Sequence, residues 1–194
     1  MGDPKRIRKK FKSPRQPFER DRIDTELKLV GKYGLRNMRS VWKHSTLLRH
    51  FRVNARKLLS LPEEDRDIRE KELLNRLHRM GLLKKKSTLD DVLTLKVEDF
   101  LDRRLQTFVY KKGMALTPYQ ARQMITHGHV MVNERVTKSP GYLVKEGEGK
   151  TIQFSPHSPY SNPEHKALPD NVLEQKKEQK KKGKGKKRSR RQKK

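Results

Sequence analysis

The spacing of apolar residues changes at Gly128, and this change limits the possible fold more than any other feature of the sequence. Upstream, apolar side chains recur every three or four residues, as on amphipathic helices, and Ile23, Leu27 and Val30 are examples. Downstream, valines alternate with other residues over residues 129–133, as apolar residues do in a half-buried strand. We therefore expect an α+β fold in which a helical part precedes a small antiparallel sheet.

Upstream of Gly128 the helical spacing predicts a series of helices that end at or near glycines. The predicted helices cover residues 19–34, 37–61, 60–81, 96–113 and 117–128. Ser60 is the expected N-cap of the third helix, whose buried side should include Ile68, Leu73, Leu74 and Leu77. A further helix should begin near Ser87 and Asp90, which stand at the spacing of a capping box.

Downstream of Gly128 the sequence predicts three short strands joined by tight turns. The strands should cover residues 129–133, 141–145 and 150–154. The first turn should lie at Asn133–Glu134, and Gly147 and Gly149 mark the second.

The helix expected to start at Pro118 carries polar groups opposite its apolar side. Thr117 and Gln120 form a capping box, and Ala121, Met124 and Ile125 should face the core. The opposite side should carry Tyr119, Arg122, Gln123 and Thr126. An aromatic ring, a guanidinium and an amide can stack on a base, bind a phosphate and bond a base edge. From this pattern alone, a solvated polar face is an equally good interpretation.

The net charge favours RNA contact over a solvated face. Lysine and arginine number 50 against 23 aspartate and glutamate residues, and 50 − 23 gives +27. Such a charge predicts strong binding to polyanions, because each neutralised phosphate releases counterions. Only 31% of residues are hydrophobic, so we expect small folded units joined by basic segments that order on a partner.

The residue types present argue against a metal site, a cofactor, catalysis or a membrane segment. The chain has no cysteine, which removes disulfides, thiolate nucleophiles and cysteine-bearing zinc sites. His127 and His129 should point the same way, but no third ligand is adjacent and only Glu134 offers a carboxylate. RNA contact or turn capping is the preferred role of these histidines. No run approaches the roughly 18 apolar residues of a membrane span.

Two aromatic residues near the N-terminus receive different interpretations. Trp42, the only tryptophan, is expected to pack between helices rather than stack on bases. Tyr33 is flanked by glycines and by Lys32, Arg36 and Asn37, so it is included among the RNA contacts.

The segment from Phe100 to Lys145, FLDRRLQTFVYKKGMALTPYQARQMITHGHVMVNERVTKSPGYLVK, resembles the S-four RNA-binding domain. The likeness rests on a Leu-Asp helix, a glycine turn, Ala-Arg-Gln, His-Gly-His-Val and Val-Asn. Upstream, GKYGLRNMRSVWKHSTLLRHFRVNARKLLSL and the phrase LDRRLQT resemble the small-subunit ribosomal protein S-four family of the archaeal and eukaryotic type. This likeness covers roughly residues 11–160.

The resemblance implies a helical N-terminal domain and an S-four domain of two helices packed on a small antiparallel sheet. With the composition, it divides the chain into a basic arm at 1–18, a helical rRNA-binding domain at 19–98, the S-four domain at 99–160 and a basic tail at 161–194. Both arms are disorder-prone in composition. Two positions depart from the motif: Phe100 replaces its usual basic residue, and Pro118-Tyr119 replaces Ser-Arg. We expect Arg103, Arg104 and Tyr119 to substitute for the residues that the motif usually has.

The resemblance also implies a function. Members are structural constituents of the small ribosomal subunit in the cytoplasm. They bind a multi-helix junction in the 5′ domain of its rRNA, nucleate assembly of the subunit body and contribute to translational accuracy. Expected partners are this rRNA, neighbouring small-subunit proteins and messenger RNA where it enters the subunit, with no membrane and no homo-oligomer. Some relatives carry a cysteine zinc knuckle, which this chain lacks, so no metal is implied.

Pattern and resemblance together give a set of residues expected to contact RNA. These are Arg8, Lys9, Lys10, Lys12, Arg15, Lys32, Tyr33, Arg36, Asn37, Arg39, Arg49, Arg52, Arg56, Arg103, Arg104, Thr107, Lys111, Lys112, Thr117, Tyr119, Gln120, Arg122, Gln123, Thr126, His127, His129, Asn133, Arg135 and Lys138.

Two other classes of function stay open. An RNA-modifying or tRNA-charging enzyme would need a catalytic domain, and no glycine-rich nucleotide loop or nucleophile–base pair is present. A non-ribosomal RNA chaperone or general polyanion binder would explain the basic tail, but not a capped and alternating segment in the middle of the chain.

Removing the residues from Gln175 onward should weaken rRNA affinity and flatten its salt dependence. The reason is that the tail adds phosphate contacts without reading sequence. Binding titrations over a range of salt concentrations would measure both effects. Thermal unfolding is the control, and loss of the melting transition in the truncated protein would show that the tail is structural instead.

Overall fold

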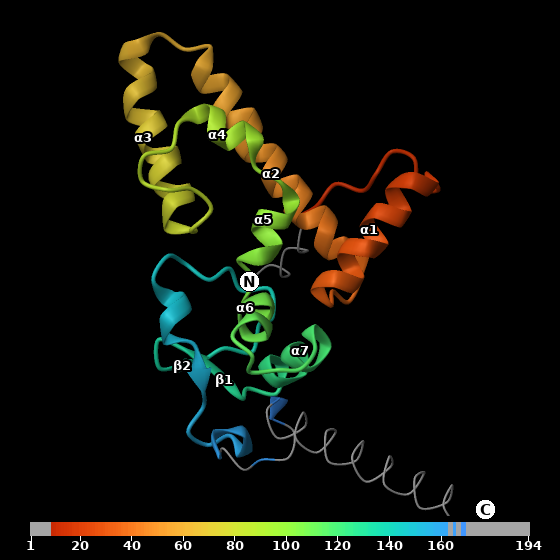
Figure 1. Ribbon diagram of the computed structural model, residues 1–194. Helices are drawn as coiled ribbons and strands as arrows, with labels where there is room; N and C mark the ends of the chain where they lie inside the picture. The colour runs from red at the N-terminus through yellow and green to blue at the C-terminus, as the bar shows by residue number, and fades with distance from the viewer. Residues whose placement is uncertain (1–8, 163–164, 166–167, 170–194) are drawn as a thin grey trace, which may run out of the picture.

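The computed structural model describes residues 9–162, 165 and 168–169, so Arg8 and the tail from residue 170 lie outside the described residues. Helices α1 to α5 form one end of the molecule, and α6, α7 and the sheet form the other (Figure 1). The α+β class predicted from the sequence is confirmed. No helix of the described part is long and apolar enough to cross a membrane.

The helical end is built around α2, the longest helix. The elements are α1 (Arg20–Tyr33), α2 (Met38–Leu59), α3 (Glu63–Arg79), α4 (Leu89–Thr94) and α5 (Val97–Asp102). The side of α2 that bears Phe51 and Ala55 packs against α3, α4 and α5, as helical spacing predicted. Buried residues of this core are Leu48, Phe51, Ala55, Leu58, Leu73, Leu77, Leu89, Val92, Leu95 and Phe100.

Helix α3 starts later than predicted, and one residue expected on its buried side is exposed. Pro62 is its N-cap, whereas Ser60 closes α2 by donating its hydroxyl to Lys57 O at 2.8 Å. Ile68, expected to be buried, is 69% exposed. Leu77 is fully buried and stands nine residues further on, about 180° around the helix at 3.6 residues per turn. The predictions for the N-cap and for Ile68 were therefore wrong, whereas Leu73 and Leu77 are buried and Leu74 is partly buried, as expected.

The start of α4 was predicted one residue too early. Thr88 and Asp91 form its capping box, in which Thr88 N donates to Asp91 Oδ2 at 2.9 Å. Ser87 and Asp90 have the same spacing but do not cap the helix.

The helix predicted over residues 96–113 is in fact two helices, α5 and α6 (Leu105–Lys111). A segment much later in the sequence, residues 142–144, pairs with the backbone at this break. Leu105 N donates to Tyr142 O at 2.8 Å, and Val144 N donates to Arg103 O at 2.8 Å. Residues 141–145 therefore form an isolated bridge, Arg104 to Leu143, and are not the predicted sheet strand.

The change from helix to strand at Gly128 is confirmed. Helix α7 (Pro118–Thr126) ends before Gly128, which has φ +81°, and β1 (Val130–Val132) follows. The predicted turn is also confirmed, since Asn133 and Glu134 both have positive φ, as a tight hairpin requires.

The sheet is antiparallel, with the order β2-β1-β3. Strand β2 (Arg135–Val136) was not predicted. Of the strand expected over residues 150–154, only Gln153–Phe154 pairs in the sheet, as β3, after a 3₁₀ turn η1 (Glu148–Thr151). A second 3₁₀ turn, η2, covers Pro159–Ser161. Ala121, Met124 and Ile125 are buried in the second core, as expected. That core contains Leu105, Val109, Ala115, Ala121, Met124, Ile125, Val130, Val132, Val144 and Ile152.

A fully buried side chain, Gln106, helps to join the two ends of the molecule. Gln106 belongs to α6, and its Nε2 donates to Tyr33 O at 3.1 Å, Gly34 O at 2.8 Å and Pro118 O at 2.9 Å. Gly34 has φ +58°, and a Cβ there would lie 2.6 Å from Pro118 Cβ. The C-terminus of α1 can therefore meet α7 only because residue 34 is glycine.

Substituting Gln106 by leucine should lower the free energy of unfolding by about 1–3 kcal/mol, because buried carbonyls would lose their donor. Chemical denaturation would measure the change. Gln123→Leu, at an exposed position of α7, is the matched control and should shift stability by at most about 0.5 kcal/mol. Equal effects of the two substitutions would contradict the structural role given to Gln106.

Candidate RNA interface

The N-terminal arm lies along α2 and creates two adjoining cavities that share Lys12 and Thr46. The arm cavity, of about 790 Å³, is lined by Lys12, Ser13, Pro14, Arg15, Gln16, Glu19, Arg22, Glu26, Trp42, Ser45, Thr46 and Arg49. The junction cavity, of about 440 Å³, is lined by Lys9, Lys10, Phe11, Lys12, Lys43, His44, Thr46, Leu47, His50, Gly141 and Leu143. Of these two cavities, only the junction cavity includes residues from the end of the molecule that contains α6, α7 and the sheet, namely Gly141 and Leu143.

Hydrogen bonds fix the arm in this position. Lys12 N donates to Thr46 Oγ1 at 3.0 Å, and Thr46 Oγ1 donates to Trp42 O at 2.8 Å. Trp42 packs as expected: its ring lies 5.9 Å from that of Phe11, and its Nε1 donates to Glu26 Oε2 at 2.9 Å. The arm is therefore positioned by α2 before any partner binds.

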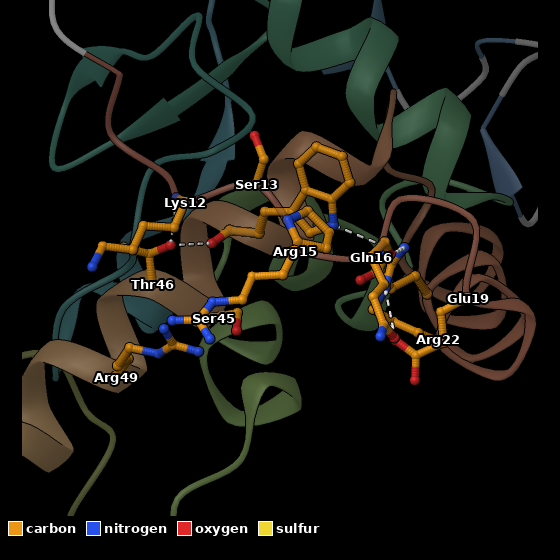
Figure 2. Close-up of a pocket in the computed structure, with 12 residues that line it drawn as sticks. Lys12, Ser13, Arg15, Gln16, Glu19, Arg22, Ser45, Thr46 and Arg49 are labelled. Carbon is orange, nitrogen blue, oxygen red and sulfur yellow. Dashed lines mark hydrogen bonds and ion pairs between the residues drawn. The ribbon is translucent and has the colours of Figure 1, made fainter.

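The arm cavity contains both paired and unpaired cations. Arg22 is paired, since its Nη1 lies 3.0 Å from Glu26 Oε2. Lys12, Arg15 and Arg49 are exposed and form no ion pair within the described residues. Figure 2 shows Arg15 and Arg49 near Lys12 and Thr46 at one end of the cavity, with Arg22 and Glu19 at the other. The unpaired end is suited to an anion such as phosphate.

Helix α7 presents the polar side that its spacing predicted. Tyr119 is 56% exposed, Gln123 and Thr126 are exposed, and Arg122 is half-buried without an ion-pair partner in the described part of the chain. Thr117 and Gln120 cap the helix, since Thr117 Oγ1 accepts from Gln120 N at 3.2 Å. Gln120 Oε1 also accepts from Leu116 N at 2.8 Å.

Three residues predicted to contact RNA are buried instead. Tyr33 is 5% exposed; burial, together with the nearby Asp102 carboxylate that accepts its hydrogen bond, raises the pKa of its hydroxyl. Thr107, 6% exposed, donates its hydroxyl to Leu101 O at 2.7 Å. Arg104 is 5% exposed. Tyr33 and Thr107 are satisfied by protein groups, so we remove them from the proposed contact set.

Other predicted residues also bind protein groups, although they reach the surface. Arg103 Nε donates to Met80 O at 3.1 Å, its Nη2 lies 3.4 Å from Glu146 Oε2, and its guanidinium lies 5.2 Å from the Phe108 ring centre. Further pairs of this kind are Lys111–Asp102, Lys32–Glu98, Lys112–Ile152 O, Arg52–Leu95 O, Arg56–Arg52 O and Asn133–Thr151. These contacts occupy the donors within the protein, and Arg103, which is held by Met80 O, Glu146 and Phe108, is also removed from the proposed contact set.

The remaining predicted residues are exposed and make no side-chain contact of this kind with the described protein. They are Lys9, Lys10, Lys12, Arg15, Arg36, Asn37, Arg39, Arg49, Arg135 and Lys138. Of these, Lys9 lies 5.8 Å from the Phe11 ring centre. Their contacts with RNA stay a prediction.

His127 and His129 lie side by side, with ring centres 6.2 Å apart. His129 Nδ1 lies 3.1 Å from Ser158 Oγ, and Tyr160 packs its edge against the same ring at 5.0 Å. Among the described residues, no group of three histidine, cysteine, aspartate or glutamate side chains could hold a metal ion. His129 is therefore a packing residue of the second domain, and His127 is the exposed member of the pair.

The predicted set omits part of the cavity lining. Lys43, His44 and His50 of α2 line the junction cavity. Helical spacing could have shown that residues 43 and 50 share a face, since seven residues make about two turns. His44 is buried, which lowers its pKa to about 4, and its Nδ1 lies 2.6 Å from Ser40 O. It is therefore neutral near pH 7.

Comparisons with known proteins agree with this arrangement. Residues 103–149 match the family model of the S4 domain, so this part of the chain is an S4 domain. Residues 5–102 match the model of the ribosomal protein S4/S9 N-terminal domain. The two matches meet at Arg103, where the helix break separates α5 from α6.

Relatives that match most of the chain identify the family to which it belongs. It is 55% identical over 161 residues to small ribosomal subunit protein uS4 of Hyperthermus butylicus, covering 83% of this chain and 92% of the relative. The proteins of the same name from Ignicoccus hospitalis (51% over 160 residues; 82% and 96% covered) and Sulfolobus acidocaldarius (52% over 161 residues; 82% and 92% covered) are similar to it as well. The chain belongs to the uS4 family of small ribosomal subunit proteins.

Arg122→Ala should weaken binding to the rRNA junction by about 1–3 kcal/mol, the scale of a lost charge-assisted contact. The free energy of unfolding should change by at most about 0.5 kcal/mol, because Arg122 makes no ion pair with the described residues. Paired measurements of affinity and of melting would check both values.

Ile125→Ala, one turn along α7, is the matched control. Ile125 is fully buried, so its truncation should cost about 2–5 kcal/mol of stability through cavity formation. Its binding loss should follow unfolding. If instead Arg122→Ala melts the domain and the folded fraction binds normally, Arg122 is structural.

Proposed function

We propose that this protein is a structural constituent of the small ribosomal subunit in the cytoplasm and a primary binder of its rRNA. Its site is a multi-helix junction in the 5′ domain, where binding nucleates assembly of the subunit body and contributes to translational accuracy. The observation that carries the proposal is the basic surface formed by the arm and α2, whose junction cavity extends to the S4 domain.

The arrangement suits a folded RNA better than an arbitrary polyanion. Unpaired cations at the arm and α2 can neutralise phosphates, which supplies affinity without reading sequence. The α7 surface adds Tyr119 and Gln123, which can stack on a base and bond its edge. Because Gln106 fixes α1 against α6 and α7, only an RNA of matching shape can meet both surfaces at once.

The proposal includes further partners in the assembled subunit. Neighbouring small-subunit proteins and messenger RNA, where it enters the subunit, are expected to contact faces that the rRNA leaves free. The protein is expected to act as a monomer, without catalysis.

Competition binding tests the proposed function. Unlabelled junction RNA should displace the protein from labelled junction RNA at far lower concentrations than a duplex of equal length. The protein should also co-sediment with small subunits after a high-salt wash. Equal displacement by the duplex would instead identify a general polyanion binder or RNA chaperone.

A second experiment tests whether the cations of the arm cavity, rather than net charge alone, bind the RNA. Replacing Arg15 and Arg49 by alanine should weaken binding and reduce the slope of log affinity against log salt by about 1–2, because each phosphate contact contributes about 0.7–0.9. Replacing the exposed Arg69 and Arg79 of α3 removes the same charge and should change the slope much less. Similar changes in both double variants would show that net charge, and not the arm cavity, determines binding.

A further inference from the structure

Arg104, the N-cap residue of α6, carries a buried guanidinium that no acidic group neutralises. It is 5% exposed, its Nε has no hydrogen-bond partner, and it forms no ion pair within the described residues. Asp102, two residues away, is paired with Lys111 at 3.1 Å. An unpaired buried cation destabilises a folded protein unless an anion is supplied.

The surroundings of Arg104 add positive charge rather than removing it. Burial, followed by the nearby Arg122 cation, lowers the pKa of Arg104 to about 10, so the Arg104 guanidinium stays charged near pH 7. Arg104 in turn acts on His44, where burial is the main cause of the low pKa and the Arg104 charge lowers it further. The free protein therefore holds like charges together at the junction of its two domains.

The guanidinium is not itself part of the junction-cavity lining, but it lies against Gly141, which is. A Cβ built on Gly141 would lie 3.6 Å from Arg104 Nη2 and 3.8 Å from its Cζ, so a larger side chain at residue 141 would cover the guanidinium. Gly141 lines the junction cavity, and so does His44. The lining also includes Lys9, Lys10, Lys12 and Lys43, and contains no acidic residue.

We propose that the junction cavity is a phosphate site, in which one backbone phosphate of bound RNA serves as the counter-ion of Arg104. The phosphate would contact the S4 domain through Arg104 and the helical domain through Lys43 and the arm. Binding at this point thus joins both domains through one anion. The RNA source of the phosphate rests on the proposed function, whereas the phosphate site itself does not.

The decisive variant is Arg104→Met, which keeps the aliphatic part of the side chain and removes the charge. RNA affinity should fall about ten- to one-hundredfold, as for a lost hydrogen bond to a charged group. The melting temperature of the free protein should rise by about 2–4 °C, because an unneutralised buried charge is removed. A fall in melting temperature with unchanged RNA affinity would overturn the proposal.

The neighbouring Arg103→Met variant is the matched control. Arg103 is paired with Met80 O and Glu146, so its loss should lower the melting temperature and change the affinity of the folded protein less than threefold. We therefore expect the melting temperature to rise in Arg104→Met and to fall in Arg103→Met. If the two variants behave alike, Arg104 is merely structural.

Inorganic phosphate tests the site without any RNA. Phosphate should raise the melting temperature of the full-length protein more than chloride at equal ionic strength, and Arg104→Met should reduce the difference to the part that the arm cavity and the general stabilising effect of phosphate supply. Gly141→Leu keeps the Arg104 charge but covers it, and should reduce both the phosphate effect and RNA affinity. Equal phosphate effects in wild type and Arg104→Met would overturn the site. A reduced phosphate effect with unchanged RNA affinity would overturn RNA as the source.

Discussion

The side-chain amide of Gln106 determines how the two parts of the chain sit against each other. Its Nε2 has two hydrogens and three carbonyl acceptors, so one hydrogen is shared, and two of the acceptors lie at the C-terminal end of α1. Carbonyls at a helix end have no partner within the helix. Gln106 therefore caps α1 from another domain, so the position of α1 relative to α6 and α7 depends on this arrangement.

The pairing of each cation decides which parts of that surface remain available to RNA. Arg22, Arg103 and Lys111 bind carboxylates, and they hold the protein together. Arg15 and Arg49 form no ion pair within the described residues and line a cavity beside the arm. A count of basic residues in the sequence cannot distinguish these two groups, because an acidic partner such as Glu146 lies 43 residues away from its arginine.

Short sequence patterns predicted the parts of the fold that depend on residues close together in the chain. The switch at Gly128, the α7 cap and the buried side of α7 were predicted, since each depends on residues a few positions apart. The break between α5 and α6 was not, because residues 140–144 stabilise it from across the domain. For the same reason Tyr33 was taken for an exposed residue: its burial depends on Leu35, Val41 and Leu101 packing around it.

Because the chain has few apolar residues, its unpaired cations matter for the stability of the fold. With 31% hydrophobic residues, the chain forms several small clusters instead of one large core, and like charges at the junction oppose their association. Stability that the isolated chain lacks can come from a ligand that binds only the folded state. A polyanion in contact with the arm, α2 and the S4 domain would neutralise these charges together. The same residues that limit the stability of the free protein would then make folding and RNA binding mutually dependent.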